Sequence, residues 1–573
     1  MYPFFAGGTL RGNTAGPFST IQDAQVYGRS VNSNLSGHLT LLVNPGTSGP
    51  ITFNASDSGT NGWDVIYKST SLAGHSSSGL QTVTGWTLHS GSIYRAQVGI
   101  GLPFHALYED GVRARKTRFP KLVIDPSFPK AFAPYLSATG VASSSTVLRH
   151  AVAALDTTGW NIPATEIVTW DGGVSGSGGS MSWFMGIAPV SSYSAGAREF
   201  TLTRPTRYTI HNGGIGCRFF AQGYGIPEEA GEFYYDSSTG YLYYWPVGNI
   251  ATAVIQIPTS GTKSVVTFQG TDASTEVNHV VLDGFVIEGG DFTGDYRYAF
   301  PNAGDGGGSP TYPEYDRVIS LAAHRAGGVF MRFANHCRVE RCKIRRHGYH
   351  GVFLDRDATE NRFSENLTES VGLAGYYFDG PYPGDGDTCH SNVVDNCRVQ
   401  DFGELASGEG IRIMQSGNNA ITNTHSRRGP ANGFFGGAGV VDLPVNTMYL
   451  VNNRMDRWLI EDVNQDRGDV GAMGVGGYSS KPAGPFVINY FTNGRIDGSR
   501  AHASMTDFPP DGVFTDNQSA GQVLTNIKVS DVQGSAIRVA GDSGNHTVTN
   551  CSWGAFDEAL LAADIGVRSD FPY

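Results

Sequence analysis

The sequence predicts an all-β protein: a right-handed parallel β-helix with an inserted antiparallel β domain and an N-terminal capping helix. Asparagine recurs in a similar short context, at intervals of 24 to 40 residues, at positions 366, 396, 423, 453, 493, 526 and 550. Glycine contributes 77 of the 573 residues, and charged residues make up only 16%. Abundant turns, low charge and a repeat of this length are typical of stacked β-coils.

The repeated asparagine explains how the coils stack. Asparagine tolerates the left-handed backbone conformation, and its side-chain amide bonds to the amide above and below it in a stack. Each unit then consists of a strand, an Asn corner, a second strand and a Gly-led third strand, such as 512–514. Such a fold presents columns of side chains on one long face, which suits a polymer with repeating units.

The N-terminal segment, residues 1–77, predicts a helical cap followed by the first coils. Ser19 and Gln22 have the spacing of a capping box, and Ile21 and Ala24 lie on one side of the helix that follows. A helix there covers the open end of the stack and shields its unpaired edge.

The asparagine repeat is absent from residues 78–262, and this segment is predicted to form the inserted antiparallel β domain. Hairpin-like stretches with Asp-Gly and Thr-Gly turns fill this segment, for example around positions 110 and 239. The stack resumes over 263–573, the main parallel β-helix with the catalytic cleft. A Gly- and Tyr-rich loop, about 293–316, is expected over that cleft.

Charge and composition exclude several partners. The net charge of −12 argues against nucleic acid and anionic membranes, and mildly against a strongly anionic polysaccharide unless the cleft is locally basic. No run approaches ~20 apolar residues, so no membrane span is expected. The six cysteines lack the paired spacing of a zinc site. We expect most of them to be small apolar side chains in the coil interior, and one disulfide bond is an alternative that the sequence leaves undecided. We expect a monomer that is secreted or periplasmic, with its export signal absent from this chain.

Acidic residues are the most informative polar side chains in the columns. Asp355, Asp379 and Asp516 each follow a glycine by four residues. Glycosidic bond cleavage needs two carboxyl groups, about 5–5.5 Å apart for retention of configuration or about 6.5–9.5 Å for inversion. Because strands stack at about 4.8 Å, acids one or two coils apart meet this requirement.

Several segments resemble glycoside hydrolases of family 141 and their β-helix relatives. The resemblance covers residues 8–24, 207–248, GDVGAMGVGG at 468–477 and GVFTDNQSAGQVLTN at 512–526. It implies a fucosidase or xylanase type of activity and places the two catalytic carboxylates at Asp469 and Asp516. A further phrase, ITNTHSRRGPANG, places a cleft histidine at His425 and an arginine at Arg428.

Five other candidates complete the predicted site. His425, Glu409, Asp379, Arg412 and Trp458 are the predicted substrate-binding residues, and Asp516 with Asp379 or Glu409 is the alternative acid pair. No metal or cofactor is predicted. Asp385 and Asp387 offer ligands for a structural calcium ion, but they fall short of the six to eight oxygens that calcium takes.

The sequence thus predicts a glycosidase that uses two carboxylates on a carbohydrate substrate. One alternative is a polysaccharide lyase on the same scaffold, which would neutralise a uronate and abstract its C5 proton with a basic side chain. The other is a non-catalytic glycan-binding or virion-fibre module, because fold alone does not fix function.

Overall fold

A computed structural model describes most of the chain. The described residues are 4–6, 18–139, 144–152, 155–170, 182–206, 209–210, 217–293, 326–355, 357–380, 386, 388–437, 449–476, 488–505, 508–516, 519–540 and 543–554. The predicted loop at 293–316, the calcium candidates Asp385 and Asp387, and the C-terminal tail lie almost wholly outside them.

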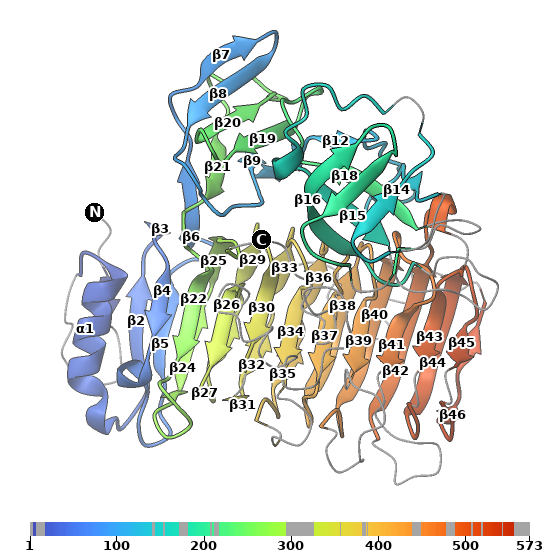
Figure 1. Ribbon diagram of the computed structural model, residues 1–573. Coiled ribbons are helices and arrows are strands. Elements are labelled where there is room, and N and C mark those ends of the chain that lie inside the picture. The colour runs from blue at the N-terminus through green and yellow to red at the C-terminus, as the bar shows by residue number, and fades with distance from the viewer. Residues whose placement is uncertain are drawn as a thin grey trace.

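The main body is a parallel β-helix whose coils stack along one axis (Figure 1), which confirms the predicted fold class. One face is a ten-stranded parallel sheet. Its strands, in order along the axis, are β4 (Ile51–Phe53), β22 (Ser264–Gln269), β26 (Gly327–Arg332), β30 (His350–Leu354), β34 (Tyr376–Asp379), β37 (Ile411–Met414), β39 (Phe434–Gly437), β41 (Gly471–Gly476), β43 (Asp511–Thr515) and β45 (Ile537–Val539).

A second, 22-stranded sheet wraps the other faces of the coils. Its parallel coil strands are β2 (Leu39–Val43), β3 (Gly46–Ser48), β5 (Val65–Ser69), β6 (His75–Thr82), β24 (Val280–Asp283), β25 (Phe285–Gly289), β28 (Arg338–Glu340), β29 (Lys343–Arg345), β32 (Arg362–Ser364), β33 (Leu367–Glu369), β35 (Val393–Asp395), β36 (Arg398–Gln400), β38 (Ala420–Arg427), β40 (Arg454–Val463), β42 (Tyr490–Ser499), β44 (Val523–Val532), β46 (Thr547–Thr549) and β47 (Ser552–Trp553). Four short strands, β1 (Phe4–Ala6), β9 (Tyr108–Glu109), β10 (Val112–Arg113) and β21 (Ile255–Pro258), pair antiparallel at its margin. A three-stranded sheet, β23 (Val277–Asn278), β27 (Ala334–Asn335) and β31 (Ala358–Thr359), fills a corner.

Left-handed residues turn each coil where two strands of this sheet meet. Asn396, Asn423, Asn493, Asn526 and Asn550 have φ between 51° and 56°, as the repeat predicts. The prediction is wrong for two members of the series. Glu365 occupies the corner in place of Asn366, and Arg457 in place of Asn453, with φ of 56° and 54°.

The two displaced asparagines lie inside the helix instead. Asn366 and Asn453 are at most 5% exposed. Asn453 belongs to a buried amide ladder in which each side-chain oxygen accepts a hydrogen bond from the residue one coil before it. The ladder runs Asn361, Asn392, Asn419, Asn453, Asn489 and Gln522. It holds neighbouring coils in register because every buried amide in it needs the next one.

The N-terminal end is covered by α1 (Ile21–Val31), the only α-helix among the described residues. Its capping box is Thr20 with Asp23, one residue later than predicted, and both reciprocal hydrogen bonds form. Ile21 and Ala24 are buried against the first coil, so the helix shields the apolar interior at this end. No helix of the described part of the chain is long and apolar enough to cross a membrane.

The insertion forms two mainly antiparallel sheets, which lie along one side of the stack of coils (Figure 1). The five-stranded sheet contains β7 (Thr87–Ser90), β8 (Ile93–Gln97), β11 (Arg115–Lys116), β19 (Glu232–Asp236) and β20 (Tyr241–Tyr244). The seven-stranded sheet contains β12 (Arg118–Phe119), β13 (Leu136–Ser137), β14 (Val147–Arg149), β15 (Glu166–Trp170), β16 (Gly186–Ser194), β17 (Glu199–Leu202) and β18 (Arg218–Gln222). The change from coil to insertion falls within β6, which pairs parallel with β25 and then antiparallel with β21.

An apolar cluster fastens the insertion to the helix. Trp170, Met185 and Phe220 of the insertion pack with Tyr349 and Met505 of the coil loops, and all five are at most 2% exposed. Burying such side chains contributes about 1.5–3 kcal/mol each. The six cysteines are free thiols, five of them buried.

We predict that Asn419→Ala lowers the free energy of unfolding by about 2–3 kcal/mol. The change leaves the buried N–H of Asn392 without its acceptor and removes the donor to Asn453. Urea unfolding followed by circular dichroism measures this. Thr547→Ala, an exposed strand position, is the control and should change stability by under ~0.5 kcal/mol. Equal stability of both variants would contradict the importance of the ladder.

Candidate active site

Three columns of side chains point outward from the ten-stranded sheet. The register places Phe330, Phe353, Tyr377, Arg412 and Phe435 in the middle column. These side chains form a cluster separate from the helix core, whereas their strand neighbours belong to that core. The column at the strand starts, nearer the insertion, includes His350, Glu409, Asn432 and Asp511. The column at the strand ends includes Arg332, Asp355, Asp379 and Asp516.

Asp355 and Asp379 are the only acids at neighbouring positions in one column of this ten-stranded sheet. Their strands are adjacent, so their Cα atoms lie about 4.8 Å apart. The Tyr377 hydroxyl donates to Asp379 at 3.2 Å, and Arg332 lies 3.4 Å from Asp355. Both acids are nearly closed to solvent, at 2% and 4% exposure.

Glu409 and Arg412 meet in a buried ion-pair network. Arg412 Nη1 lies 2.9 Å from Glu409, and Arg467 Nη1 lies 3.1 Å from its other oxygen. The Arg412 guanidinium also lies 5.7 Å from the Tyr377 ring centroid and 5.3 Å from that of Phe435. Two cations on one carboxylate fit a structural role as well as substrate binding.

The structure does not bring Asp469 and Asp516 together, so the prediction that these two acids lie side by side is wrong. β41 and β43 are adjacent, with Gly471 opposite Asp511 and Val475 opposite Thr515. Asp469 therefore precedes the start of β41, and Asp516 follows the end of β43. The two acids are therefore separated along the strand direction by about the length of the strand, roughly 16 Å.

The alternative pairs for Asp516 fail for a similar reason. Asp379 is in the same column but four strands away, at roughly 19 Å. Glu409 precedes the start of β37, whereas Asp516 follows the end of β43, so these two lie at opposite ends of the sheet.

Asp469 lies instead beside Asp511, through a shared arginine. Arg538 Nη1 donates to Asp469 Oδ1 at 3.0 Å and lies 3.4 Å from Asp511 Oδ2. The distance between Asp469 Oδ1 and Asp511 Oδ2 is therefore at most the sum of these two contact distances. Asp469 and Arg538 are partly exposed, with 15% and 34% of their side chains open to solvent, whereas the Asp511 side chain is only 3% exposed, so a ligand reaches this pair from the side of Asp469 and Arg538.

The environments of the two acids differ. Burial raises the pKa of Asp511 above its ordinary value, and the nearby Asp469 carboxylate adds to the rise, although the Ser535 N–H and Arg538 oppose it. Two neighbouring carboxyl groups in different environments are an arrangement suited to acid–base catalysis.

Asp466 is a fully buried acid between the coil loop and the insertion. Its Oδ1 accepts from the Phe132 N–H at 3.0 Å and from the Tyr135 hydroxyl. Its Oδ2 has no hydrogen-bond partner among the described residues. Burial raises the pKa of Asp466 well above its ordinary value, although the Phe132 N–H and the charges of Arg118 and Arg467 oppose the rise.

Two predicted sugar-binding residues lie elsewhere, and these predictions are wrong. Trp458 is fully buried in the helix core, and a Cβ on Gly494 would lie 1.9 Å from its ring. No sugar reaches that ring. His425 is on β38 of the other sheet, where Nε2 lies 2.6 Å from Glu461. Burial lowers the pKa of His425, and its neighbour Arg428 pairs with Asp401.

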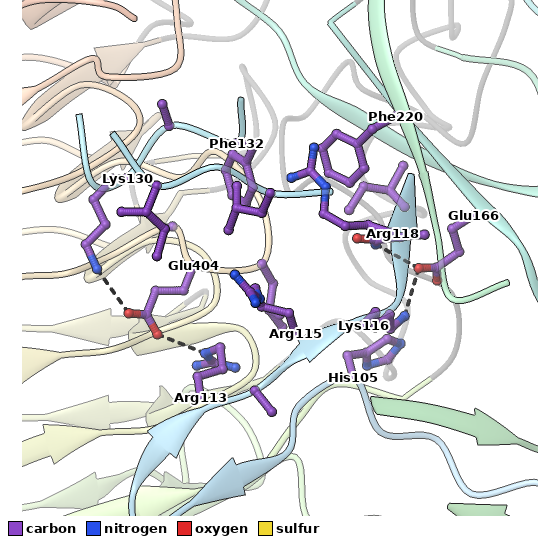
Figure 2. A pocket seen from close by; sticks show the side chains of 18 of the residues that line it. His105, Arg113, Arg115, Lys116, Arg118, Lys130, Phe132, Glu166, Phe220 and Glu404 are labelled. Atoms are coloured by element: carbon purple, nitrogen blue, oxygen red, sulfur yellow. Dashed lines mark hydrogen bonds and ion pairs between the residues drawn. The ribbon is translucent and has the colours of Figure 1, made fainter. Parts of the chain in front are cut away.

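A pocket of about 280 Å³ lies at the junction of the insertion and the coil loops. Figure 2 shows its charged lining: Arg113 lies beside Glu404 of a coil loop and Lys116 beside Glu166 of β15, while the Arg118 side chain lies towards Phe220 and Arg115 lies between them. Neither Asp469 nor Asp511 lines it. Sequence reasoning missed this junction pocket, although the run Arg113-Ala-Arg-Lys-Thr-Arg118 in an acidic chain was a signal for it.

Metal binding finds no support in the described part of the chain. No group of three or more His, Cys, Asp or Glu side chains is arranged there to hold a metal ion. The calcium hypothesis at Asp385 and Asp387 falls outside the described residues.

Comparison with solved structures shows the fold. No protein-family model and no curated protein sequence matches the chain. A structure titled "Glycoside hydrolase" is similar at 15% identity, over 97% of this chain and 96% of that chain, with a TM-score of 0.74. A structure of XylC with xylose matches at 10% identity, over 92% and 68% of the two chains, with a TM-score of 0.43. The A-module of the Azotobacter vinelandii mannuronan C-5 epimerase AlgE6 matches at 11% identity, over 54% and 72%, with a TM-score of 0.34.

We predict that Asp466→Asn removes a pH dependence of stability. Because the folded state holds the pKa of Asp466 above its unfolded value, the wild type loses stability as pH rises from about 4 towards the raised pKa. That loss reaches at most about 1.4 kcal/mol per pH unit. Urea unfolding of both proteins at pH 4 to 8 should show the wild type falling relative to the variant. A constant difference across this range would contradict the assignment.

Proposed function

We propose that the protein is a glycoside hydrolase that cleaves a glycosidic bond in a poly- or oligosaccharide by a two-carboxylate mechanism. The observation that carries the proposal is the sharing of one Arg538 nitrogen by Asp469 and Asp511. The fold likeness over nearly the whole chain to a structure titled "Glycoside hydrolase" supports it. The resemblance of the segment around Asp469 to glycoside hydrolase family 141 also supports it. Membership of that family is part of the proposal.

The environments suggest a role for each acid. Asp511, with its raised pKa, donates its proton to the glycosidic oxygen. The Asp469 carboxylate attacks the anomeric carbon, and a glycosyl ester forms as the C–O bond breaks. The Asp511 carboxylate then takes a proton from water, which hydrolyses the ester. The contacts to Arg538 keep the nearest oxygens closer than the about 6.5 Å at which the spacing of inverting pairs begins, which favours retention.

We predict that Asp469→Asn and Asp511→Asn each lower kcat by at least about a hundredfold, because each removes a group that acts in the transition state. Reducing-end release from a screen of nitrophenyl glycosides and polysaccharides measures this. Asp516→Asn is the matched control, an acid at the opposite end of the same strand, and should retain near wild-type turnover.

Two results would contradict the assignment. Near wild-type turnover in either Asn variant, with unchanged thermal unfolding, removes that residue from the mechanism. Loss of turnover confined to Asp355→Asn and Asp379→Asn would move the reaction to the stacked acids of the other column.

A polysaccharide lyase is the competing proposal, and the observation that favours it is the excess of cations in the junction pocket. A lyase needs a cation beside a uronate and leaves an unsaturated sugar. A hydrolase adds water instead.

The structure of the first product separates the two reactions. We predict a saturated sugar whose anomeric configuration equals that of the substrate, because the acid pair has the closer spacing. Proton NMR during the first turnovers measures this, with ultraviolet absorbance as the check for a double bond. An unsaturated uronate would support the lyase, and an inverted anomer would exclude Asp469 as the nucleophile.

A further inference from the structure

The junction pocket is strongly basic although the chain is acidic. Its lining contains five cationic side chains, Arg113, Arg115, Lys116, Arg118 and Lys130, and two acids, Glu166 and Glu404. The whole chain carries a net charge of −12. All five cations come from the insertion, and Arg113 and Lys130 reach Glu404 in the loop that precedes β37 (Figure 2), so the two parts of the fold build the pocket together.

Arg118 is a buried cation whose guanidinium no carboxylate contacts directly among the described residues; Asp466, Glu232 and Glu229 act on it from further away and partly offset the effect of burial on its pKa. It is 4% exposed, and its Nε and Nη2 donate to the carbonyl oxygens of Pro120 and Pro134, both at 2.9 Å. Its guanidinium lies 3.9 Å from the Phe220 ring centroid. Among the described residues it forms no ion pair, and burial lowers its pKa to about 10. A buried cation held by neutral groups is a ready partner for an anion.

Arg113 adds an unused donor. Its side chain is 8% exposed, and its Nε lies 2.8 Å from Glu404. Its Nη2 donates to the carbonyl oxygens of His347 and Ser370. Its Nη1 is buried and has no partner within the described structure. A buried donor that stays unsatisfied destabilises the fold, which favours a ligand that accepts from it.

The remaining cations are held in place by acids. Lys116 lies 2.7 Å from Glu166, whose pKa this ammonium holds low although burial opposes it. Lys130 lies 3.0 Å from Asp401 and 3.2 Å from Glu404. Arg115 pairs with Glu229 outside the pocket and is one-third exposed. The pocket is therefore preorganised, and a ligand would find donors at the unpartnered Nη1 of Arg113, at the partly exposed Arg115 and at Arg118.

We propose that the junction pocket binds the carboxylate of a uronic acid residue, and that the substrate is an acidic glycan. This rests on the proposed function, because it makes the pocket a subsite of the same hydrolase. The planar, forked guanidinium matches a carboxylate. The pocket is also apolar on one side, where Phe132, Ile187 and Phe220 offer a surface for the sugar ring.

The position of the pocket predicts the length of the substrate. Its coil residues, 403–405, precede β37, whereas Asp469 precedes β41, two strands further along the sheet. Two strand spacings amount to about 10 Å. A glycan that runs along the axis fills both places only if it contains several sugars, so a single uronic acid is too short.

Isothermal titration with three probes of matched length tests the proposal: an oligouronate, its carboxyl-reduced neutral counterpart and a sulfated oligosaccharide. We expect the wild type to bind the oligouronate at least about tenfold more tightly than the reduced form. The advantage should shrink as salt is raised, because it is a charge contact. Arg118→Met and the more exposed Arg115→Gln should each remove most of it.

Arg149→Gln is the matched control, because this arginine of the insertion has a comparable exposure and ion pair but lies outside the pocket. It should bind as the wild type does. Equal affinity for the reduced probe, tighter binding of the sulfated probe, or wild-type binding by both pocket variants would overturn the proposal.

The same proteins keep the two proposals apart. Asp469→Asn should bind the oligouronate at wild-type affinity without cleaving it. If the wild type cleaves a neutral glycan but does not bind oligouronates, the proposed uronate subsite is contradicted and the proposed hydrolase activity is supported. Tight oligouronate binding with no cleavage of any glycan would remove the hydrolase and leave a carboxylate-binding pocket.

Discussion

The fixed register between neighbouring coils is the constraint on which the rest of the structure depends. Each strand lies about 4.8 Å from the next, and the buried ladder from Asn361 to Gln522 locks that spacing with hydrogen bonds that have no alternative partner in the interior. The left-handed corners add a second lock on the outside. Because both are continuous, a position along one strand fixes which residue of the next strand lies beside it.

This register explains which parts of the site the sequence could predict. The glycine-aligned columns placed Asp355 beside Asp379 correctly, because those two coils have the same short strand. The pairing of Asp469 with Asp516 came from motif resemblance, which carries no information on where along a strand each acid falls. Asp469 precedes its strand and Asp516 follows its own. Asp511, five residues earlier, is the acid that shares an arginine with Asp469.

The other two failures have separate causes. His425 was assigned from motif resemblance, which does not say on which sheet a residue falls. Trp458 was assigned from its chemistry, but the direction of its side chain depends on the coil corner, and Arg457 occupies a corner that the repeat assigned to Asn453. That shift turns Trp458 into the core. The junction pocket was also beyond the sequence, since its cations and Glu404 are nearly 300 residues apart and meet only through the docking of the insertion.

The insertion also resolves a conflict between the net charge and an acidic ligand. Charge on a surface is screened over about 8–10 Å at physiological salt, so acids spread over a 573-residue chain have little influence inside a closed junction. What a ligand meets there is the local lining, in which Arg113, Arg115, Lys116, Arg118 and Lys130 outnumber Glu166 and Glu404, in an environment of low dielectric constant, where charge interactions are stronger. The net negative charge of the chain opposes polyanions in general. The proposed binding of a glycan carboxylate is therefore confined to the place where this segment of the insertion meets the coils.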